Sequence, residues 1–200
     1  KFRLESKSEG TRKIAATPTR FHVENIPDST YVLIPEVSSE KRNYIPMGFI
    51  TPDILSSNLV KIVPDATLYH FGILTSGMHM AWMRYVCGRL KSDYRYSKDI
   101  VYNNFPWPAP TDKQKADIEA AAQTVLDARA NYPDSSLADL YDPDTMPADL
   151  LKAHQKLDRL VEKAYGKSFD SDTARVSFLF QKYQELTMPL VAGMKGKGKK

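Results

Sequence analysis

Basic and aromatic side chains crowd into one short segment of this 200-residue chain, from Arg84 to Lys98. The segment holds five cations and three tyrosines, and Asp93 is its only acid. Cations attract phosphate groups, while Arg, Lys and Asp side chains can also hydrogen bond to the edges of bases. We expect the segment to follow a helix as a loop, from which it could contact nucleic acid. A solvated basic face with half-packed tyrosines is an equally good interpretation of this composition.

The charge of the whole chain, +4, is divided unevenly along its length. Residues 1–108 hold 14 Lys and Arg against 10 Asp and Glu, whereas residues 109–194 hold 10 against 14. The last six residues add four lysines interspersed with two glycines. This basic end predicts a disordered tail over residues 191–200, which we expect to serve solubility rather than a specific contact.

The motifs of an independent enzyme are missing from the sequence. A methyltransferase that acts on an amino group of adenine or cytosine needs an Asn/Asp-Pro-Pro-aromatic loop, and the nearest string is Asp-Pro-Asp at 142–144. A Gly-containing loop after a strand, which would hold S-adenosylmethionine, is also missing. The four histidines stand without carboxylates or cysteines at metal-ligand spacing. We therefore expect no catalytic residue, cofactor or metal in this chain by itself.

Short β-rich runs bounded by turn residues fill the first half of the chain. They predict strands over residues 31–35, 44–50, 59–63 and 100–102, with a hairpin loop at 38–43 and an extended entry over 2–22. Residues 76–86 carry Met80 and Met83 at helical spacing and predict a helix that ends at Gly88. The apolar run at 68–74 fits either type of element.

A proline-rich stretch over residues 103–110 separates this mixed half from a helical half. Beyond it, apolar positions recur at helical spacing in three segments, which begin at Thr111 or Asp112, at Pro147 and at 170–172. The predicted fold class is therefore α+β. It comprises a domain with a small mixed or antiparallel sheet over residues 1–108, an all-helical domain over 109–190 and the tail over 191–200.

Several side chains that could be functional are better explained by packing. The methionines at 78, 80 and 83 and Trp82 are expected in the core. His154 lies on the apolar face of its predicted helix and is expected to be a buried, hydrogen-bonded histidine. Trp107 stands between two prolines, where we expect it to pack between the halves rather than to stack on a base.

Length and cysteine content fit an ordinary cytoplasmic protein. The 200 residues suffice for one large or two small domains with a hydrophobic core. The single cysteine, Cys87, excludes an internal disulfide and fits a reducing cytoplasm, and we expect it to be a small buried hydrophobe. No apolar run has the length of a transmembrane helix, and the charged start does not resemble a signal peptide. A start without Met suggests a fragment of a longer chain.

Long strings of the sequence, in the same order, resemble the MmeI-like family of DNA methyltransferases and type II restriction-modification enzymes. The resemblance covers nearly all of residues 2–186. The strings are YVLIPEVSSE at 31–40, LYHFGILTS at 68–76, MHMAWMR at 78–84, CGRLKSDYRYS at 87–97, VYNNFPWP at 101–108 and LDRLVEKAYG at 157–166.

This resemblance implies a part of a larger enzyme. In that family one chain carries a methyltransferase domain, a target-recognition domain and a small helical C-terminal domain, and some members add a nuclease. The present chain resembles the last two parts, which implies sequence-specific binding of double-stranded DNA. The methyltransferase domain of the same bacterial, cytoplasmic parent would transfer a methyl group from S-adenosylmethionine to adenine N6. The rival hypothesis is a protein-interaction or adaptor module that docks a partner through its helical half.

The resemblance also implies which residues read bases. Lys91 and Asp93 match a paired position that varies with the base at one end of the recognition site. Lys can donate to guanine and Asp can accept from cytosine, so this pair fits a G·C pair. Residues two apart in an extended segment point the same way, which would bring both side chains to one base pair.

Two further reading positions follow from the same resemblance, Glu36 with Asn58 and Leu59 with Arg95. Three cations are predicted from charge alone to contact DNA phosphates: Arg84, Arg89 and Lys98.

Overall fold

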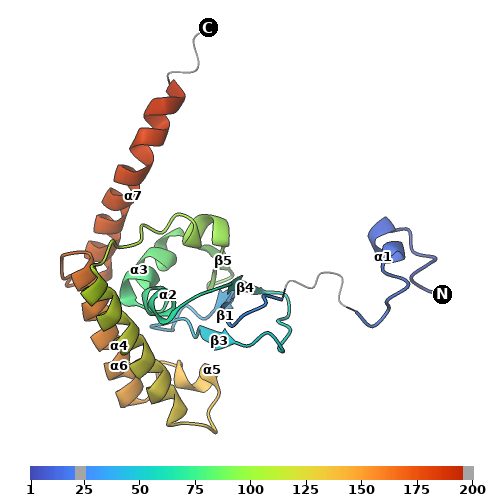
Figure 1. Cartoon of the computed structure of the whole chain (residues 1–200), viewed down its shortest axis with the longest axis horizontal. Helices are drawn as coiled ribbons and strands as arrows, with labels where there is room; N and C mark the ends of the chain where they lie inside the picture. Colours follow the sequence, from blue (N-terminus) through green and yellow to red (C-terminus); the bar gives the residue numbers. More distant parts are fainter. Residues whose placement is uncertain (21–25, 196–200) are drawn as a thin grey trace.

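The computed structural model of the chain describes residues 1–20 and 26–195, with side chains up to Met188. Figure 1 shows three layers, with the strands on one side, α2 and α3 in the middle, and α4, α6 and α7 on the other side. The elements in chain order are α1 (Glu9–Lys13), β1 (Tyr31–Pro35), β2 (Val37–Ser38), β3 (Gly48–Ile50), β4 (Val60–Val63), α2 (Leu68–Leu74), α3 (Gly77–Val86), β5 (Gly88–Leu90), β6 (Asp93–Arg95), the π-helix η1 (Lys98–Tyr102), α4 (Asp112–Ala130), α5 (Leu137–Leu140), α6 (Ala148–Ala164) and α7 (Asp172–Lys195). A mixed half with small antiparallel sheets is thus followed by a helical half, as the α+β prediction requires.

The strands form two three-stranded antiparallel sheets, in the orders β3-β1-β4 and β2-β6-β5. The predicted strand at 31–35 is β1, which lies centrally because Val32 and Ile34 alternate into the core and are fully buried. The predicted strand at 44–50 is shortened to β3, because Pro46 lacks the N–H that a ladder needs.

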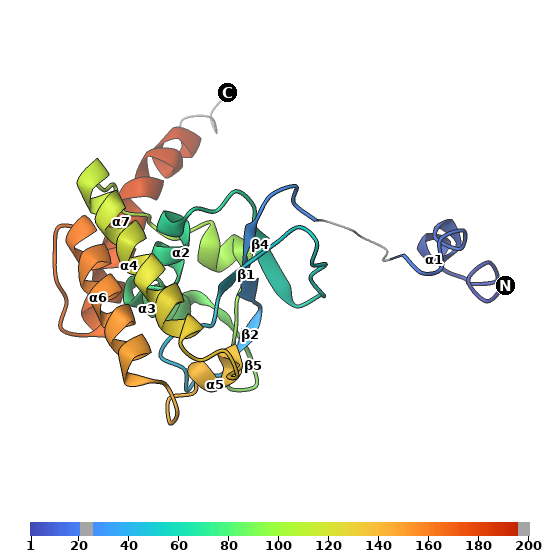
Figure 2. The ribbon, with the colours of Figure 1, turned by 60° about the horizontal axis from the view of Figure 1, so that its bottom comes forward.

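The helices α2 and α3 follow β4 and form the middle layer (Figure 2). The ambiguous run at 68–74 is helical, as α2. The helix predicted at 76–86 is α3, and the Ser76 hydroxyl caps it by accepting a hydrogen bond from the N–H of His79 at 3.4 Å. The predicted core side chains of α3 are confirmed, since each is at most 2% exposed: Met78, Met80, Trp82 and Met83.

The predicted strand at 100–102 is wrong, because these residues belong to η1. The β-branched pair Ile100 and Val101 favours a strand by propensity alone. The chain coils instead, and the N–H of Asn103 donates to the carbonyl of Lys98 at 2.8 Å. Coiling also turns Val101 into the core, where it is fully buried. Tertiary packing therefore outweighs local propensity here.

The two ends of the chain also differ from the sequence-based expectation. The extended entry predicted over 2–22 contains the short helix α1, which Ser8 caps by accepting from the N–H of Thr11, while residues 21–25 lie outside the described part. The disordered tail predicted over 191–200 begins too early, because α7 continues to Lys195. Residues 196–200 lie outside the described part.

The helical half begins at Thr111, as predicted. Its hydroxyl caps α4, and the Gln114 side chain accepts from the Thr111 N–H at 2.9 Å, which completes a capping box. α4 packs against α6 and against α2, while α7 packs against α3. Gly72 permits the close approach of α2 to α4, because a Cβ at this position would lie 2.9 Å from Cγ2 of Ile118. One hydrophobic core therefore runs through both halves.

Three other packing predictions have mixed outcomes. His154 is fully buried, and its Nε2 lies 2.7 Å from the Tyr141 hydroxyl, as expected of a buried, hydrogen-bonded histidine. Trp107 packs its ring against Tyr69, Tyr102 and Phe105, which all precede it in the chain, and it lines a hollow together with Tyr165 of the helical half. Cys87 packs against the core but is only half-buried, so it is more exposed than the expected buried hydrophobe.

Candidate nucleic-acid interface

The basic segment over residues 84–98 contains a β-hairpin and is not the loop expected from the sequence. β5 and β6 pair in antiparallel register, with Leu90 opposite Asp93. Residues 91 and 92 therefore form a two-residue turn, in which Lys91 has a φ of 56°. A positive φ is uncommon outside glycine and is typical of tight hairpin turns.

The two faces of this hairpin have different environments. Paired residues share a face, so Leu90, Asp93 and Arg95 lie on one face, and Arg89 lies with Tyr94 on the other. Tyr94 is 6% exposed, and the guanidinium of Arg89 lies 4.4 Å from its ring centroid. The face that carries Asp93 and Arg95 is the more open one and can approach a ligand, whereas Arg89 covers a core tyrosine.

Lys91 and Asp93 are not two positions of one extended segment, so strand alternation does not align their side chains. Lys91 is exposed in the turn, while Asp93 is the first residue of β6. Two residues span at most about 7 Å along the chain, so both side chains still leave the backbone at the tip of one hairpin. Their joint reading of a base pair stays a prediction that rests on this proximity.

Glu36 joins the two sheets, because it stands between β1 and β2. Its N–H donates to the carbonyl of Leu59 at 2.9 Å, and its own carbonyl accepts from the N–H of Tyr96 at 2.7 Å. The next residue, Val37, pairs with Arg95. The fold thus brings together three of the predicted base-reading residues, Glu36, Leu59 and Arg95, from distant parts of the sequence.

Leu59 has a φ of 67° and a side chain that is 56% exposed. A positive φ is a genuine outlier for a bulky residue, and such strain concentrates at functional positions. It also explains why β4 begins at Val60, one residue later than predicted. The neighbouring Asn58 is exposed, and its carbonyl accepts from the Ser57 hydroxyl at 3.1 Å.

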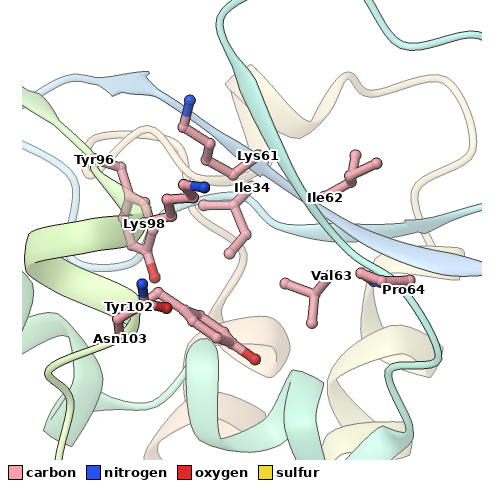
Figure 3. Close-up of a pocket in the computed structure, with 9 residues that line it drawn as sticks. All are labelled: Ile34, Lys61, Ile62, Val63, Pro64, Tyr96, Lys98, Tyr102 and Asn103. Carbon is pink, nitrogen blue, oxygen red and sulfur yellow. The ribbon is translucent and has the colours of Figure 1, made fainter. Parts of the chain in front are cut away.

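Lys61, which the sequence did not single out, forms an ion pair with Glu36. The Glu36 side chain is 13% exposed and that of Lys61 is 34% exposed. Both line a hollow of about 330 Å³ together with Arg95 and Lys98. Lys61 and Lys98 also border an adjoining apolar pocket of about 170 Å³ (Figure 3). The only sequence signal for Lys61 is its place in a strand two residues after Leu59.

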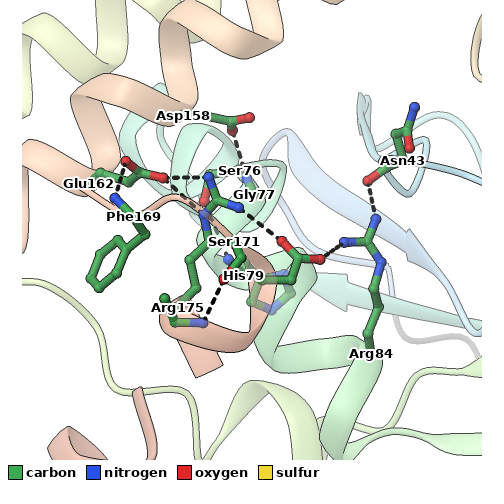
Figure 4. Close-up of polar contacts among 12 residues, drawn as sticks. Asn43, Ser76, Gly77, His79, Arg84, Asp158, Glu162, Phe169, Ser171 and Arg175 are labelled. Atoms are coloured by element: carbon green, nitrogen blue, oxygen red, sulfur yellow. Dashed lines mark hydrogen bonds and ion pairs between the residues drawn. The ribbon is translucent and has the colours of Figure 1, made fainter. Parts of the chain in front are cut away.

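Arg84 is held in a polar network between α3 and α7 (Figure 4). Its guanidinium forms an ion pair with Asp172 and donates to the carbonyl of Asn43 at 2.7 Å. Asp172 also pairs with Arg175 at 2.9 Å, and Arg175 pairs with the buried Glu162 at 2.7 Å. Arg84 therefore links α3, the helix before the hairpin, to α7 of the helical half. Its predicted phosphate contact would require it to leave these partners.

The other two cations predicted to contact phosphates differ in how they are engaged. Arg89 lies 3.6 Å from the Glu40 carboxylate, on the hairpin face that covers Tyr94. Lys98 is 68% exposed, and its Nζ lies 4.0 Å from the carboxylate of Asp99. Lys98 is thus the better placed of the two to reach a phosphate.

Two buried histidines are uncharged, and one of them, His79, lies directly behind this interface. Nε2 of His79 lies 3.1 Å from the hydroxyl of Tyr96, the residue that follows Arg95. Burial lowers the pKa of His79 to about 4. Burial, with a smaller effect of the Arg129 charge, lowers the pKa of His154 to about 3. Both rings are therefore uncharged at neutral pH and act as core polar groups.

The candidate interface offers hydrogen-bonding groups and positive charge, and the part of the chain that the structure describes shows neither a metal site nor a membrane-spanning helix. Within 1–20 and 26–195, no group of three or more His, Cys, Asp or Glu side chains is placed to hold a metal ion. Among the helices of these ranges, none combines the length and the apolar character that crossing a membrane requires.

Comparison with known proteins confirms the resemblance seen in the sequence. The family model of the MmeI target recognition domain matches residues 1–109, and that of the MmeI C-terminal domain matches residues 110–191. DNA methyltransferase A of Bacillus subtilis (strain 168) is 46% identical over 186 residues, which are 92% of this chain and 21% of that protein. The solved structure of the Type IIL restriction-modification enzyme MmeI in complex with DNA is 52% identical, with a TM-score of 0.87, over 94% of this chain and 25% of that chain. This chain, which spans only a fifth to a quarter of these relatives, belongs to the MmeI family and comprises its target recognition and C-terminal domains.

Proposed function

We propose that this chain is the sequence-specific DNA recognition module of an S-adenosylmethionine-dependent DNA adenine-N6 methyltransferase of the restriction-modification type, in the bacterial cytoplasm. The observation that supports this proposal is the clustering of base-reading chemistry at the hairpin and at the adjoining junction of the two sheets. The hairpin contributes Asp93 and Arg95, and the sheet junction contributes Glu36 and Leu59.

The side chains in this cluster match the groups that the major groove displays. Lys91 can donate to O6 and N7 of guanine, and Asp93 can accept from N4 of the paired cytosine. Glu36 can accept from an amino group, and Arg95 can donate to guanine. Lys98, exposed beside the same hollow, supplies a phosphate contact. Base contacts would set the sequence preference, and phosphate contacts would set the affinity and its salt dependence.

Methyl transfer itself belongs to the remainder of the parent enzyme. The apolar pocket of about 170 Å³ is smaller than the roughly 300–1,000 Å³ of typical small-molecule sites. Lys61 and Lys98 border this pocket and, with Arg95, also line the hollow of about 330 Å³, so neither cavity suits the positively charged sulfonium of S-adenosylmethionine. We expect calorimetry to detect no micromolar binding of S-adenosylmethionine to this chain, whereas tight binding would contradict the assignment.

A mobility-shift titration with duplex DNA across a salt series tests the proposal. We expect binding that weakens steeply with salt, and a K98A variant whose slope of log affinity against log salt is reduced by about 0.9, the value for one phosphate. The control is K113A, which removes a cation that is 83% exposed on α4, where Lys113 pairs with Asp117 at 3.0 Å. This control should keep the slope of the parent chain.

Failure to bind DNA at low salt would favour the rival, an adaptor module that docks a protein partner. Its supporting observation is the exposed apolar surface on α7, where Leu186 is 61% and Met188 is 69% exposed. A DNA affinity that is equal in K98A and in the parent chain would leave recognition possible but would remove Lys98 from the interface.

A further inference from the structure

The ion pair between Lys61 and Glu36 lies at the junction of the two sheets. Lys61 is on β4 opposite Ile34 of β1, and Glu36 follows the end of β1, so the ion pair forms where the chain passes from one sheet to the other. The Lys61 ammonium donates to Oε1 of Glu36. Figure 3 shows the Lys61 side chain beside Ile34 at the pocket, with Lys98 nearby.

We propose that Lys61 is a specificity-determining residue that positions the Glu36 carboxylate for reading an amino group, N4 of cytosine or N6 of adenine, in the major groove. This inference rests on the proposed DNA-recognition function and deepens it. Lys61 acts through Glu36 and is therefore a positioning residue.

The geometry leaves one carboxylate oxygen available. The backbone of Glu36 is fixed on both sides, by its N–H bond to Leu59 and by its carbonyl bond from Tyr96. Lys61 engages Oε1, whereas the described residues supply no hydrogen bond to Oε2. A carboxylate with a tethered oxygen and a fixed backbone has few orientations, which favours one donor position over others.

The charge of Lys61 is the second reason why it can position Glu36 for base reading. A base-reading carboxylate must approach a polyanion, and an uncompensated negative charge next to phosphates is repelled. The Lys61 ammonium makes the pair neutral, and Arg95 and Lys98 line the same hollow. The pair therefore presents an acceptor at the hollow without a net negative charge.

The test uses the full-length parent enzyme and reads its methylated motif by single-molecule sequencing of host DNA. We expect K61M to reduce the preference for an amino-bearing base at one position of the site by about tenfold, the scale of one base contact, with the other positions unchanged. K61R, which keeps a cation in reach, should restore the preference. In an E36Q background, K61M should cause no further change at that position.

A second measurement does not depend on how well K61M folds. Duplexes are prepared in which cytosine or adenine is replaced, one position at a time, by an analogue that lacks the exocyclic amino group. The wild-type enzyme should lose about tenfold in affinity at the position that Glu36 reads, and K61Q should lose less there than wild type loses. Equal losses in the two enzymes would overturn the inference.

Failure of this inference can be told from failure of the proposed function. If K61M keeps the original motif while variants of Lys91 and Asp93 change it, recognition stands and Lys61 does not position Glu36. If neither set of variants changes the motif, the proposed recognition surface is itself wrong. A K61M enzyme that loses affinity equally for all sequences, without rescue by K61R, would make Lys61 a phosphate contact and overturn the positioning role.

Discussion

Replacing Arg84 with methionine separates the structural role of this residue from a role in DNA binding. Methionine keeps much of the aliphatic stem and removes the guanidinium, which pairs with Asp172 and donates to the Asn43 carbonyl at 2.7 Å. A hydrogen bond from a charged group contributes about 1.5–3 kcal/mol to stability. The ion pair contributes about 0–1 kcal/mol, because Asp172 is 39% exposed.

Neither partner of Arg84 is left without a hydrogen bond in the variant, which limits the decrease in the free energy of unfolding. Asp172 keeps its ion pair with Arg175 at 2.9 Å, and Asn43 is exposed, so water can reach its carbonyl. We therefore expect R84M to lower the free energy of unfolding by about 2 kcal/mol, and to lower Tm by roughly 4–8 °C in a chain of this size.

Two assays measure these consequences. Urea unfolding followed by circular dichroism gives the free energy of unfolding for the parent chain, R84M and K98M. A DNA titration across a salt series gives the slope that counts phosphate contacts. R84M should be destabilised with an unchanged slope, whereas K98M should be stable with a reduced slope. An R84M chain of full stability whose slope falls by about 0.9 would refute this reasoning and make Arg84 the phosphate contact that charge alone suggested.

Two further predictions concern the shared core. G72A should lower the free energy of unfolding by about 1–3 kcal/mol through overpacking against Ile118. The control, G48A, should be close to neutral because nothing lies within 4 Å of a Cβ there. Equal urea midpoints for the two variants would contradict the close approach of α2 and α4. Burial lowers the pKa of His79 to about 4 and that of His154 to about 3, whereas a histidine in the unfolded chain has a pKa of about 6.5. Below about pH 6.5 the unfolded chain therefore binds more protons than the folded chain. The contribution of the two neutral histidines to stability is complete above about pH 6.5 and is lost as the pH falls toward 4, by at most about 2.7 kcal/mol per pH unit. H154Q should halve this slope when the free energy of unfolding is measured by urea titration at successive pH values.

The parts of the fold that sequence predicted well are those with local physical causes. Ser76 and Thr111 mark helix starts because a capping hydroxyl acts on backbone groups two or three residues away. The strand at 31–35 follows from its own β-branched and aromatic residues and from the proline that ends the run. The turn of η1 was missed because its β-branched residues coil only when Val101 packs into a core built by distant segments.

The candidate site shows the same division between local and distant causes. The cluster of cations was visible in the sequence, but its two faces were not, because they depend on the register of β5 and β6. Arg84 finds its partner Asp172 88 residues later, when α7 packs against α3. Lys61 meets Glu36 only through the pairing of β1 and β4. Charge alone could not separate a cation that builds the fold from one that faces a ligand.

The hairpin tip offers a direct test of base reading, through Lys91 and Asp93 in the full-length parent enzyme. The positive φ of 56° at Lys91 restricts which substitutions the turn accepts. Asparagine and aspartate tolerate this conformation better than most residues. K91N therefore removes the charge with the turn preserved, and K91D/D93R reverses the order of donor and acceptor without straining the backbone.

If the two side chains jointly read a G·C pair, K91N should lose roughly 1–3 kcal/mol of recognition energy, the typical cost of one base contact. K91D/D93R should do more than lose affinity. Its acceptor then stands where the donor stood, so the preference at that one position should move from G toward C, while all other positions hold. Single-molecule sequencing of methylated host DNA reads the outcome directly. A double variant that still methylates the original motif would show that neither side chain reads a base, and the hairpin tip would then be a solvated or phosphate-contacting surface.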